Sequence, residues 1–544
     1  MGWGLAVLVP LALLAVFFGW PVGAMLWRGL SAEGVVDLGP LVELLRRERT
    51  WRIIGQTLGM AFAGMLGSVA LGVPGAFVLY RLRFPGRLAM RSLVAIPFVL
   101  PTVVVGVAFR ALLAKQGPLG FLGLDSTITA VVLAMIFFNY SVVVRTVGLM
   151  WSSLDPRTAD AARTLGASPW RAFRTVTLPQ LMPAITSSAS IVFLFCSTAF
   201  GIVQTLGRPG VGTLESEIYV QTTLLHLDTA AMLSCLQFVI VIATVLVSNR
   251  LRRGTEASLR MRDSRPRAPR GSDAPAIVAT IVVAVVLVSA PLVALVVRSF
   301  TTREGWGTRN YELLATSTGA GFGGGTTVLQ ALENSVRIAT DATWLALVIA
   351  VPLALVLSRR PRAPLWREGQ WLLDGAIMLP LGVSAVTVGF GFVVSIQATM
   401  PELARTGLLV PVAQAVVAVP MVVRVLVPTL RAIDPRQREV AATLGASPAR
   451  IVRTVDGPVL LRGLGLGAGF AFAMSLGEFG ATSFLASPEF LTLPILIARL
   501  LGRPGADNYG LAMAAAVVLA LLTAGVMLLA ERLRPRGAKE GPLW

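Results

Sequence analysis

The side chains that most often perform covalent or metal chemistry are scarce in this sequence. Its 544 residues include one histidine, His226, and two cysteines, Cys196 and Cys235. A single imidazole is too few for a multi-histidine metal centre or a histidine-dependent dyad, and we find no nucleophile motif. The sequence therefore predicts no catalytic residue, no metal site and no bound cofactor in this chain.

The lysines exclude one kind of nucleotide site. A P-loop needs Gly-Lys followed by Ser or Thr, because backbone amides and the lysine together hold the phosphates. The chain has two lysines: Lys115 is followed by Gln116, and Lys539 is followed by Glu540. If ATP drives this protein, ATP and Mg²⁺ must be used by another chain, and this chain is not itself an enzyme.

One acid stands alone in an apolar stretch, Glu478 in the string SLGEFGAT. Ionisable side chains inside the membrane are costly, so each one is a functional candidate. Glu478 could line a transport path and attract a cation, or it could cap a helix break at the neighbouring Gly477 and Gly480. The capping role is favoured, because the matching position in the first half of the chain is Ala199.

A polar stretch occurs twice in the chain. LDPRTADAARTLGASPWRAFRTVTLP at residues 154–179 aligns without gaps on IDPRQREVAATLGASPARIVRTVDGP at residues 433–458. We call these segments the first elbow and the second elbow. The best match lies in a polar loop, so chance similarity between hydrophobic helices does not explain it.

Each elbow carries the same start and stop signals for two short helices. An Asp-Pro pair supplies an N-cap carboxylate and a proline at the first helical position. A glycine can end that helix in the left-handed conformation, a Ser-Pro pair starts the next helix, and a further proline stops it. These residues are Asp155, Gly166, Ser168 and Pro179 in the first elbow, and Asp434, Gly445, Ser447 and Pro458 in the second. A joining loop has no need of the same caps twice, whereas a surface that docks two copies of one partner does.

The elements that position these residues are membrane helices. The chain is 55% hydrophobic and 14% charged, and runs of about 20 apolar residues, enough to cross a hydrocarbon core, recur along it. We predict an all-α integral membrane protein with about twelve transmembrane helices. They lie near Leu5–Trp27, Ile54–Leu79, Leu93–Leu113, Ile128–Met150, Ala184–Thr205, Ala230–Ser248, Ala276–Val297, Val336–Leu357, Trp371–Ile396, Leu408–Leu430, Leu464–Leu485 and Tyr509–Ala530.

The net charge of +19 would suggest a nucleic-acid partner in a soluble chain, but the placement of the charges indicates a membrane topology instead. With the N-terminus inside, the predicted cytoplasmic segments hold about thirty Lys and Arg residues, as the positive-inside rule requires. Those segments are Arg81–Arg91, Trp151–Pro183, Asn249–Pro275, Ser358–Gln370, Arg431–Gly463 and Glu531–Trp544. We expect a multi-pass bacterial inner-membrane protein in contact with lipid, with both termini cytoplasmic and no nucleic-acid partner.

The repeat divides the chain into two halves of six predicted helices each. Because six is even, both halves enter the membrane with the same orientation, as a parallel repeat about an axis along the membrane normal. We predict a first six-helix domain at residues 1–249 and a cytoplasmic linker, rich in Arg, Pro and Ser, at 250–275. A second six-helix domain is expected at 276–531, followed by a cytoplasmic tail at 532–544.

The elbows resemble the EAA loop of ABC-importer permeases, in which Glu-Ala-Ala is followed after three residues by Gly, and further on by Leu-Pro. The departures are Asp160 for Glu in the first elbow, and Val440 for Ala and Gly457 for Leu in the second. The resemblance implies a tandem pair of type I (MetI-like) permease domains, whose coupling helices sit in grooves of two cytoplasmic ATPase subunits. The docking residues that it implies are Asp160, Ala161, Ala162, Gly166, Ala167 and Ser168, and Glu439, Val440, Ala441, Gly445, Ala446 and Ser447.

A finer resemblance is to the fused, two-module permeases of thiamine and ferric-iron importers. YRLRFPGRLAM at residues 80–90, TLESEIY at 213–219 and EFLTLPILI at 489–497 look most like the thiamine branch. This resemblance implies that a separate extracytoplasmic binding protein selects the solute. Thiamine or a thiamine phosphate is the first expectation, and ferric iron or another small solute is the alternative.

A rival from another class is a secondary carrier driven by an ion gradient, which can also be built from parallel repeats. Such a carrier needs no docking loop, and its midplane helices should carry paired ionisable groups. Glu478 alone makes a poor case for it.

Overall fold

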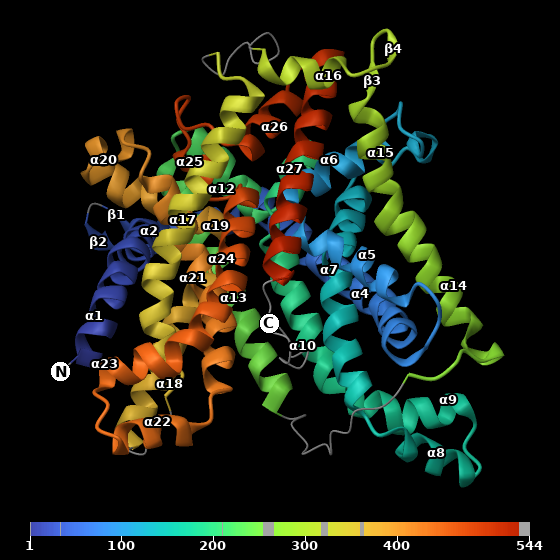
Figure 1. Cartoon of the computed structure of the whole chain (residues 1–544). Coiled ribbons are helices and arrows are strands. Elements are labelled where there is room, and N and C mark those ends of the chain that lie inside the picture. The colour runs from blue at the N-terminus through green and yellow to red at the C-terminus, as the bar shows by residue number, and fades with distance from the viewer. Residues whose placement is uncertain are drawn as a thin grey trace.

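The computed structural model describes residues 2–32, 34–208, 210–253, 266–316, 325–359 and 364–532, and these fold almost entirely into helices (Figure 1). Two short antiparallel hairpins interrupt them, β1 (Ser31–Ala32) with β2 (Val35–Val36) and β3 (Thr301–Thr302) with β4 (Gly305–Trp306). Ser31 pairs with Val36, and Thr301 pairs with Trp306. Much of the predicted linker and nearly all of the predicted tail lie outside the described residues.

In the described part of the chain, ten helical spans are long and apolar enough to cross a membrane, or up to twelve if each of two bent pairs counts as one span. In the first half they are Val7–Leu30 (α1, η1 and α2), Glu48–Arg81 (α4), Ile128–Ser153 (α7), Pro169–Ser197 (α9, η3 and α10) and Leu227–Val247 (within α13). In the second half they are Gly271–Ser299 (η4, α14, η5 and α15), Val328–Leu357 (α17), Leu409–Arg431 (α21), Pro448–Gly477 (α23, η8 and α24) and Ala506–Arg532 (α27). The predicted all-α membrane protein with about twelve helices is confirmed.

Shorter elements lie between these spans. They are α3 (Gly39–Arg46), η2 (Gly120–Leu122), α8 (Pro156–Thr164), α11 (Gly201–Leu206), α12 (Leu214–Thr223), α16 (Arg309–Glu312), η6 (Leu313–Ala315), α20 (Pro401–Arg405), α22 (Pro435–Thr443), α25 (Thr482–Leu485) and α26 (Leu493–Leu501). Helices α8 and α22 belong to the elbows, and α11, α12, α25 and α26 follow the fifth span of each half.

The third span of each half is broken, where the sequence predicted a straight helix. Helices α5 (Arg87–Val99) and α6 (Thr102–Leu113) meet at 108°, and α18 (Pro364–Gly382) meets the segment formed by α19 (Ala385–Phe392) and η7 (Val393–Gln397) at 85°. In the first bend, Pro101 pushes the preceding Leu100 into an extended conformation. In the second, the hydroxyl of Ser384 caps the new helix by accepting from the amide of Thr387 at 3.0 Å.

The fifth span of each half begins and ends earlier than predicted. The sequence placed helices at Ala184–Thr205 and Leu464–Leu485, but the structure ends them at Ser197 and Gly477. The expected stop at Pro179 and Pro458 is also wrong. A π-helical segment before each proline (Phe173–Thr177 and Val452–Asp456) lets the chain stay helical although proline lacks an amide hydrogen.

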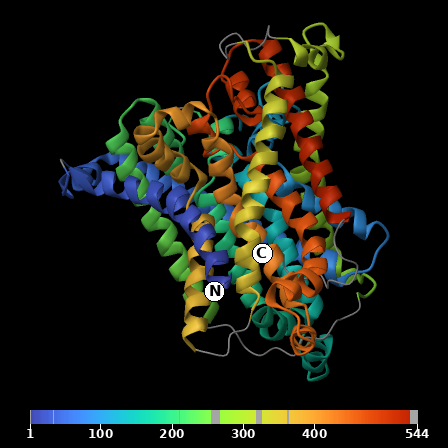
Figure 2. The same ribbon diagram turned by 60° about the vertical axis from the view of Figure 1, so that its left-hand side comes forward.

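The two halves exchange their first helices. Helix α1 (Gly2–Leu14) contacts α17 and α2 (Trp20–Leu30) contacts α19, so the start of the chain packs on the second half. In return, α14 (Ala274–Val282) contacts α4 and α15 (Ala290–Ser299) contacts α6 of the first half. Figures 1 and 2 show the dark-blue N-terminal helices beside the yellow and orange helices of the second half. The halves of the sequence therefore form one interlocked bundle.

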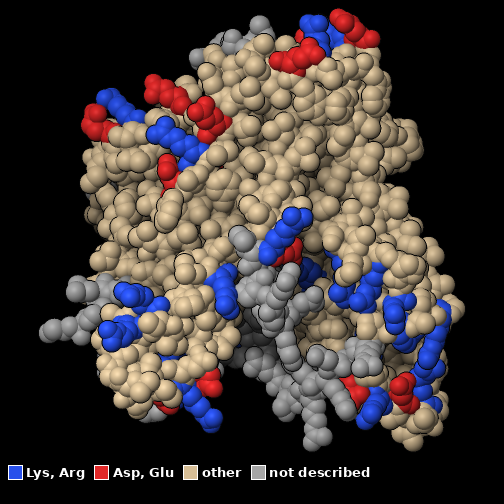
Figure 3. All heavy atoms as spheres, in the orientation of Figure 1, with Lys and Arg blue, Asp and Glu red and all other residues tan. Residues whose placement is uncertain are grey.

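Charged side chains gather at the two ends of this bundle. Figure 3 shows a broad uncharged band across the middle, with mostly basic residues at the lower end, which also carries the elbows. Large apolar side chains are exposed on the band, among them Trp344, Val348 and Leu521. Such a surface is expected where lipid tails replace water.

Candidate functional site

The caps predicted for the elbows are present in both halves. The carboxylate of Asp155 accepts from the amide of Arg157 at 3.0 Å, and that of Asp434 accepts from Arg436 at 2.9 Å. These caps begin α8 (Pro156–Thr164) and α22 (Pro435–Thr443). The second cap repeats as well, because Ser168 and Ser447 accept from the amides three residues further on. The local sequence signals therefore produce the same helix starts twice.

Each elbow turns at a glycine in the left-handed conformation. Gly166 has a φ of +88° and Gly445 has a φ of +79°. The next amide, of Ala167 or Ala446, returns to a carbonyl of the preceding helix, at 3.1 Å in the first elbow and 3.0 Å in the second. This is the hydrogen bond that closes a Schellman-type helix end. Only glycine adopts this φ without cost, so the residue type fixes the angle between the two short helices.

The turn exposes an apolar side chain at the same repeat position in both halves. Leu165 is 88% exposed and Leu444 is 82% exposed. Among the predicted docking residues, only Ala162, Ala167, Ala441 and Ala446 are partly buried, and the others are exposed. An exposed leucine that recurs on a polar loop is typical of a surface that a partner covers.

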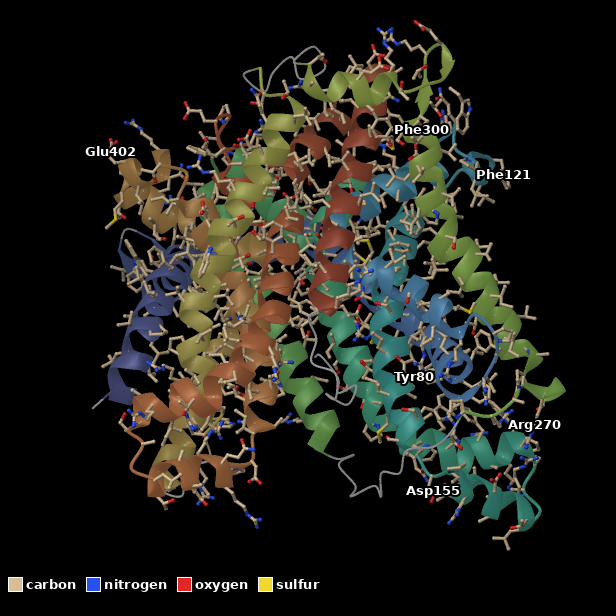
Figure 4. All side chains as sticks on the ribbon, in the orientation of Figure 1. Tyr80, Phe121, Asp155, Arg270, Phe300 and Glu402 are labelled. Atoms are coloured by element: carbon tan, nitrogen blue, oxygen red, sulfur yellow. The ribbon has the colours of Figure 1, made fainter. Side chains whose placement is uncertain are left out.

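Both elbows lie at the same end of the molecule. In Figure 1, α8 and α9 (Pro169–Ala172) lie at the lower right, and α22 and α23 (Pro448–Ile451) lie at the lower left. Figure 4 marks Asp155 at the start of the first elbow. The docking role of the elbows stays a prediction. The two elbows present matched and accessible surfaces on which a partner could bind.

A cavity of about 330 Å³ lies between the halves, and residues of both halves line it. Its wall is rich in aromatic rings and methionines, including Phe98, Phe138, Phe200, Phe470, Phe479 and Met474. The polar lining residues include Asn139, Ser384 and Glu478, and among the described residues no lysine or arginine lines it. Aromatic faces, thioethers and one carboxylate suit a flat, cationic organic solute.

Residues at matching positions of the two repeats contact each other at the wall of this cavity. Phe200 and Phe479 occupy matching positions, and their rings stack across the boundary between the halves with centroids 5.2 Å apart. Each is followed by a glycine that packs against the bend of the broken third span. A Cβ atom on Gly480 would lie 2.9 Å from the Cβ of Ala385, and one on Gly201 would clash with the hydroxyl of Thr102. Both halves therefore bring a helix break, a stacked ring and a bend to the same cavity.

Glu478 lies at the end of α24 (Gly457–Gly477), so its predicted place in the middle of a helix is wrong. Its carboxylate accepts from the amides of Ala481 at 2.8 Å and Thr482 at 2.9 Å, and from the hydroxyl of Thr482. These bonds cap α25 (Thr482–Leu485). The same residue also lines the cavity. The geometry allows Glu478 both roles that the sequence raised, and its role in the path stays a prediction.

A second buried acid, Glu215, was not singled out from the sequence. It lies in α12 (Leu214–Thr223), which is not among the membrane spans, and its side chain is fully buried. One carboxylate oxygen accepts from the hydroxyl of Ser384 at 2.8 Å, and the other has no hydrogen-bond partner within the described part of the chain. Burial raises the pKa of Glu215 to about 8, although the Ser384 hydrogen bond lowers it in part.

This contact joins α12 of the first half to the bend of the second half, since Ser384 caps α19 there. The sequence did hold a signal for Glu215. Thr213-Leu214 recurs as Thr492-Leu493, but the acid at the next position is replaced by Pro494. An acid that breaks a repeat beside a helix N-terminus could have been identified as a candidate.

The chain's one histidine, His226, contacts the side-chain oxygen of Gln221 at 3.1 Å. Among the residues that the structure describes, no three His, Cys, Asp or Glu side chains are grouped so that they could hold a metal ion.

Comparison with known proteins gives a consistent result over most of the chain. The sequence pattern of the family described as "Binding-protein-dependent transport system inner membrane component" matches residues 64–302 and 366–539. The thiamine transport system permease protein of Salmonella typhimurium is 30% identical over 508 residues, which cover 90% of each chain. Its counterpart in Brucella suis is 27% identical over 500 residues, covering 89% of this chain and 87% of the relative. A crystal structure of a bacterial alginate ABC transporter aligns with 46% of this chain and 93% of its own, with 19% identity and a TM-score of 0.40.

Proposed function

The chain belongs to the family of binding-protein-dependent transport system inner membrane components, and from that premise we propose that it is the permease of an ATP-driven importer of thiamine or a thiamine phosphate. Two ATPase subunits would bind the two elbows, and a solute-binding protein would deliver the solute to the other face. As a family member, the chain is a multi-pass inner-membrane transport component, and we propose that ATP is hydrolysed by a separate subunit.

The observation that carries the ATP-driven part of this proposal is the pair of elbows. Two surfaces with the same caps, the same left-handed glycine and the same exposed leucine suit two copies of one partner. Neither lysine of the chain fits a P-loop, so the motor has to be a separate subunit. ATP-driven closure of the ATPase pair would move the elbows together and switch access to the cavity.

We infer the orientation of the chain in the membrane from the distribution of its charged side chains. The end that carries the elbows is the more basic one (Figure 3), and the positive-inside rule assigns such an end to the cytoplasm. This placement puts the elbows where an ATPase subunit can reach them. We propose that both termini are cytoplasmic, in keeping with two domains of six helices each at 1–249 and 276–531.

The substrate is inferred from the relatives and from the cavity. Two relatives that align along nine-tenths of this chain are thiamine permeases. A wall of phenylalanine and methionine with one carboxylate suits the aromatic, positively charged thiamine molecule. Ferric iron, the alternative, prefers several hard oxygen ligands, and the cavity wall supplies a single carboxylate.

The test is transport by the complete system in proteoliposomes. We expect uptake of radiolabelled thiamine only when the ATPase, ATP and the solute-binding protein are all present. Uptake of ferric iron in place of thiamine would correct the substrate. Uptake driven by an ion gradient without ATPase or ATP would overturn the proposal and establish the secondary carrier.

A further inference from the structure

A fully buried carboxylate lies near the C-terminal end of the second elbow. Asp456 is at the end of η8 (Val452–Asp456), immediately before α24, and its side chain is 0% exposed. One of its oxygens accepts from Nε of Arg438 at 2.8 Å, and the other accepts from the Arg359 guanidinium. We call Asp456, Arg359 and Arg438 the ion clamp.

The ion clamp connects the elbow with three membrane helices. Arg438 belongs to the elbow helix α22, and it also donates to the carbonyl of Leu430 in α21 at 3.1 Å. Arg359 follows the end of α17, and Asp456 itself begins α24. A displacement of α22 is therefore passed to the ends of α17, α21 and α24 through charge-assisted hydrogen bonds, which are short and directional.

The first elbow has no such cluster. The residues at the positions of Asp456 and Arg438 are Thr177 and Ala159, and the segment Phe173–Thr177 contains no acid. The arginine at the end of the long helix is kept, as Arg81. Its side chain donates to the carbonyl of Leu154 at 3.4 Å, and the charges of Asp160 and Asp155 in the first elbow act on it.

The first elbow is connected by rings instead. Four side chains from α4, α7, η3 and α9 form a continuous series, which we call the aromatic ladder: Phe77, Trp151, Phe173 and Trp170. Successive ring centroids lie 5.3, 6.1 and 5.6 Å apart. At the matching positions the second half has only aliphatic residues, Leu355, Leu430, Val452 and Ala449. The fully buried carboxylate therefore belongs to the second elbow alone, and the series of rings belongs to the first elbow alone.

From this difference we propose that Asp456 is a positioning residue that transmits the motion of the second elbow to the membrane helices, a task that the aromatic ladder performs in the first half. The inference rests on the proposed docking of ATPase subunits at the elbows. A buried carboxylate between two guanidinium groups holds one geometry, and loss of its charge leaves both arginines without that acceptor. The ring contacts of the aromatic ladder, in contrast, involve no charge and no hydrogen bond between the rings.

The experiment uses the complete transporter in proteoliposomes and measures solute imported per ATP hydrolysed. Asp456→Asn keeps the size of the side chain and removes its charge. We expect the imported solute per ATP to fall about tenfold, a change within the range for residues that carry coupling. The ATPase subunits should still co-purify with the variant, and Asp456→Glu should restore part of the ratio.

The matched control is Thr177→Asn, which places the same amide at the repeat position in the first half. Its ratio should stay within about twofold of the wild type, because no ion pair is lost there. If Asp456→Asn fails to accumulate in the membrane, Arg438→Gln removes one arm of the clamp and leaves Asp456 paired with Arg359. That variant should then show the fall in ratio.

Three results would overturn the inference. One is a wild-type ratio in a folded Asp456→Asn or Arg438→Gln variant. Another is loss of ATPase co-purification in step with transport, which would make Asp456 a support of the docking surface. The third is an equal loss of ratio in Thr177→Asn. Failure of the proposed function is distinguishable from all three, because wild-type protein would then bind no ATPase.

Discussion

In both halves the elbow exposes a leucine, Leu165 or Leu444, after a helix with the same aspartate cap and before a glycine with positive φ. Directly beneath, the halves differ. Asp456 ties the second elbow to its membrane helices through two arginines, whereas stacked rings around Phe173 connect the first. The region of the cavity shows the same divergence. Glu478 in the cavity wall is matched by Ala199, and Glu215, which accepts from Ser384 of the wall, is matched by Pro494.

This contrast separates two kinds of constraint. Under the proposed docking, the outer surface of each elbow would have to fit one copy of the same partner, which requires two copies of one shape. The interior would only have to keep the elbow attached to the membrane helices, and ion pairs or ring contacts can each do so.

The largest effect, on binding of the ATPase, is expected at the turn glycines that both elbows share. Replacing Gly166 or Gly445 with Val forces a β-branched residue to a positive φ, which costs at least about 1–2 kcal/mol and changes the angle of the elbow. A Cβ would meet nothing within 4 Å at either site, so the backbone alone is tested. We expect co-purified ATPase to fall about tenfold for each variant, and further for the double variant.

The control for these variants is asparagine, which tolerates the left-handed conformation. Gly166→Asn and Gly445→Asn should retain most of the ATPase. Unchanged co-purification in both valine variants would refute the docking assignment. A loss confined to one half would break the comparison between the elbows.

The next largest effect is expected for Glu478, an acid in the cavity wall whose counterpart in the first half is Ala199. Glu478→Gln removes the charge while keeping one acceptor for the amides of Ala481 and Thr482. If Glu478 attracts the cationic solute, the KM for uptake should rise about tenfold, the effect of losing a charged hydrogen bond. Ala199→Gln, at the matching position, should change KM less.

The opposite outcome has a clear meaning for Glu478. Unchanged uptake kinetics together with a lower thermal stability would leave only the cap of α25. The difference between Glu478 and its counterpart Ala199 would then concern folding and not transport.

The smallest effect is expected for Glu215, as a change in the way that thermal stability depends on pH. Burial raises the pKa of Glu215 from 4.5 to about 8, so the folded protein favours the neutral carboxyl. The stability from this group is therefore complete below about pH 4.5 and is lost as pH rises through about 8. Glu215→Gln should be less sensitive to pH than the wild type across this window, as measured by thermal unfolding in detergent. Parallel pH profiles for the two proteins would contradict the burial of this carboxyl.

What the sequence could predict was local. Asp155, Gly166 and Ser168 act within a few residues of themselves, so the elbow caps could be predicted from spacing alone. The helices followed from apolar runs of sufficient length. Pro101 and Ser384 lie inside such runs, so their bends were hidden by a hydropathy that stays high on both sides.

The remaining features depend on contacts between segments far apart in the chain. The bond from Ser384 to Glu215, the stack of Phe200 on Phe479 and the exchange of first helices all join the two halves. A repeat shows which positions correspond, but it does not show how the two copies pack. The ion clamp could not be predicted from the sequence for the same reason. Its members lie far apart in the chain, since Arg359 follows α17 and Asp456 precedes α24.

The measurement that tests the central claim most directly is site-specific cross-linking at the elbows. Leu165→Cys and Leu444→Cys place a thiol at a highly exposed position of each elbow, while Cys196 and Cys235 are buried. We predict that both thiols cross-link to the ATPase subunit in a complex that is active in transport, and with similar yield. Absence of any cross-link from either position in such a complex would contradict the claim that the elbows are where the motor binds.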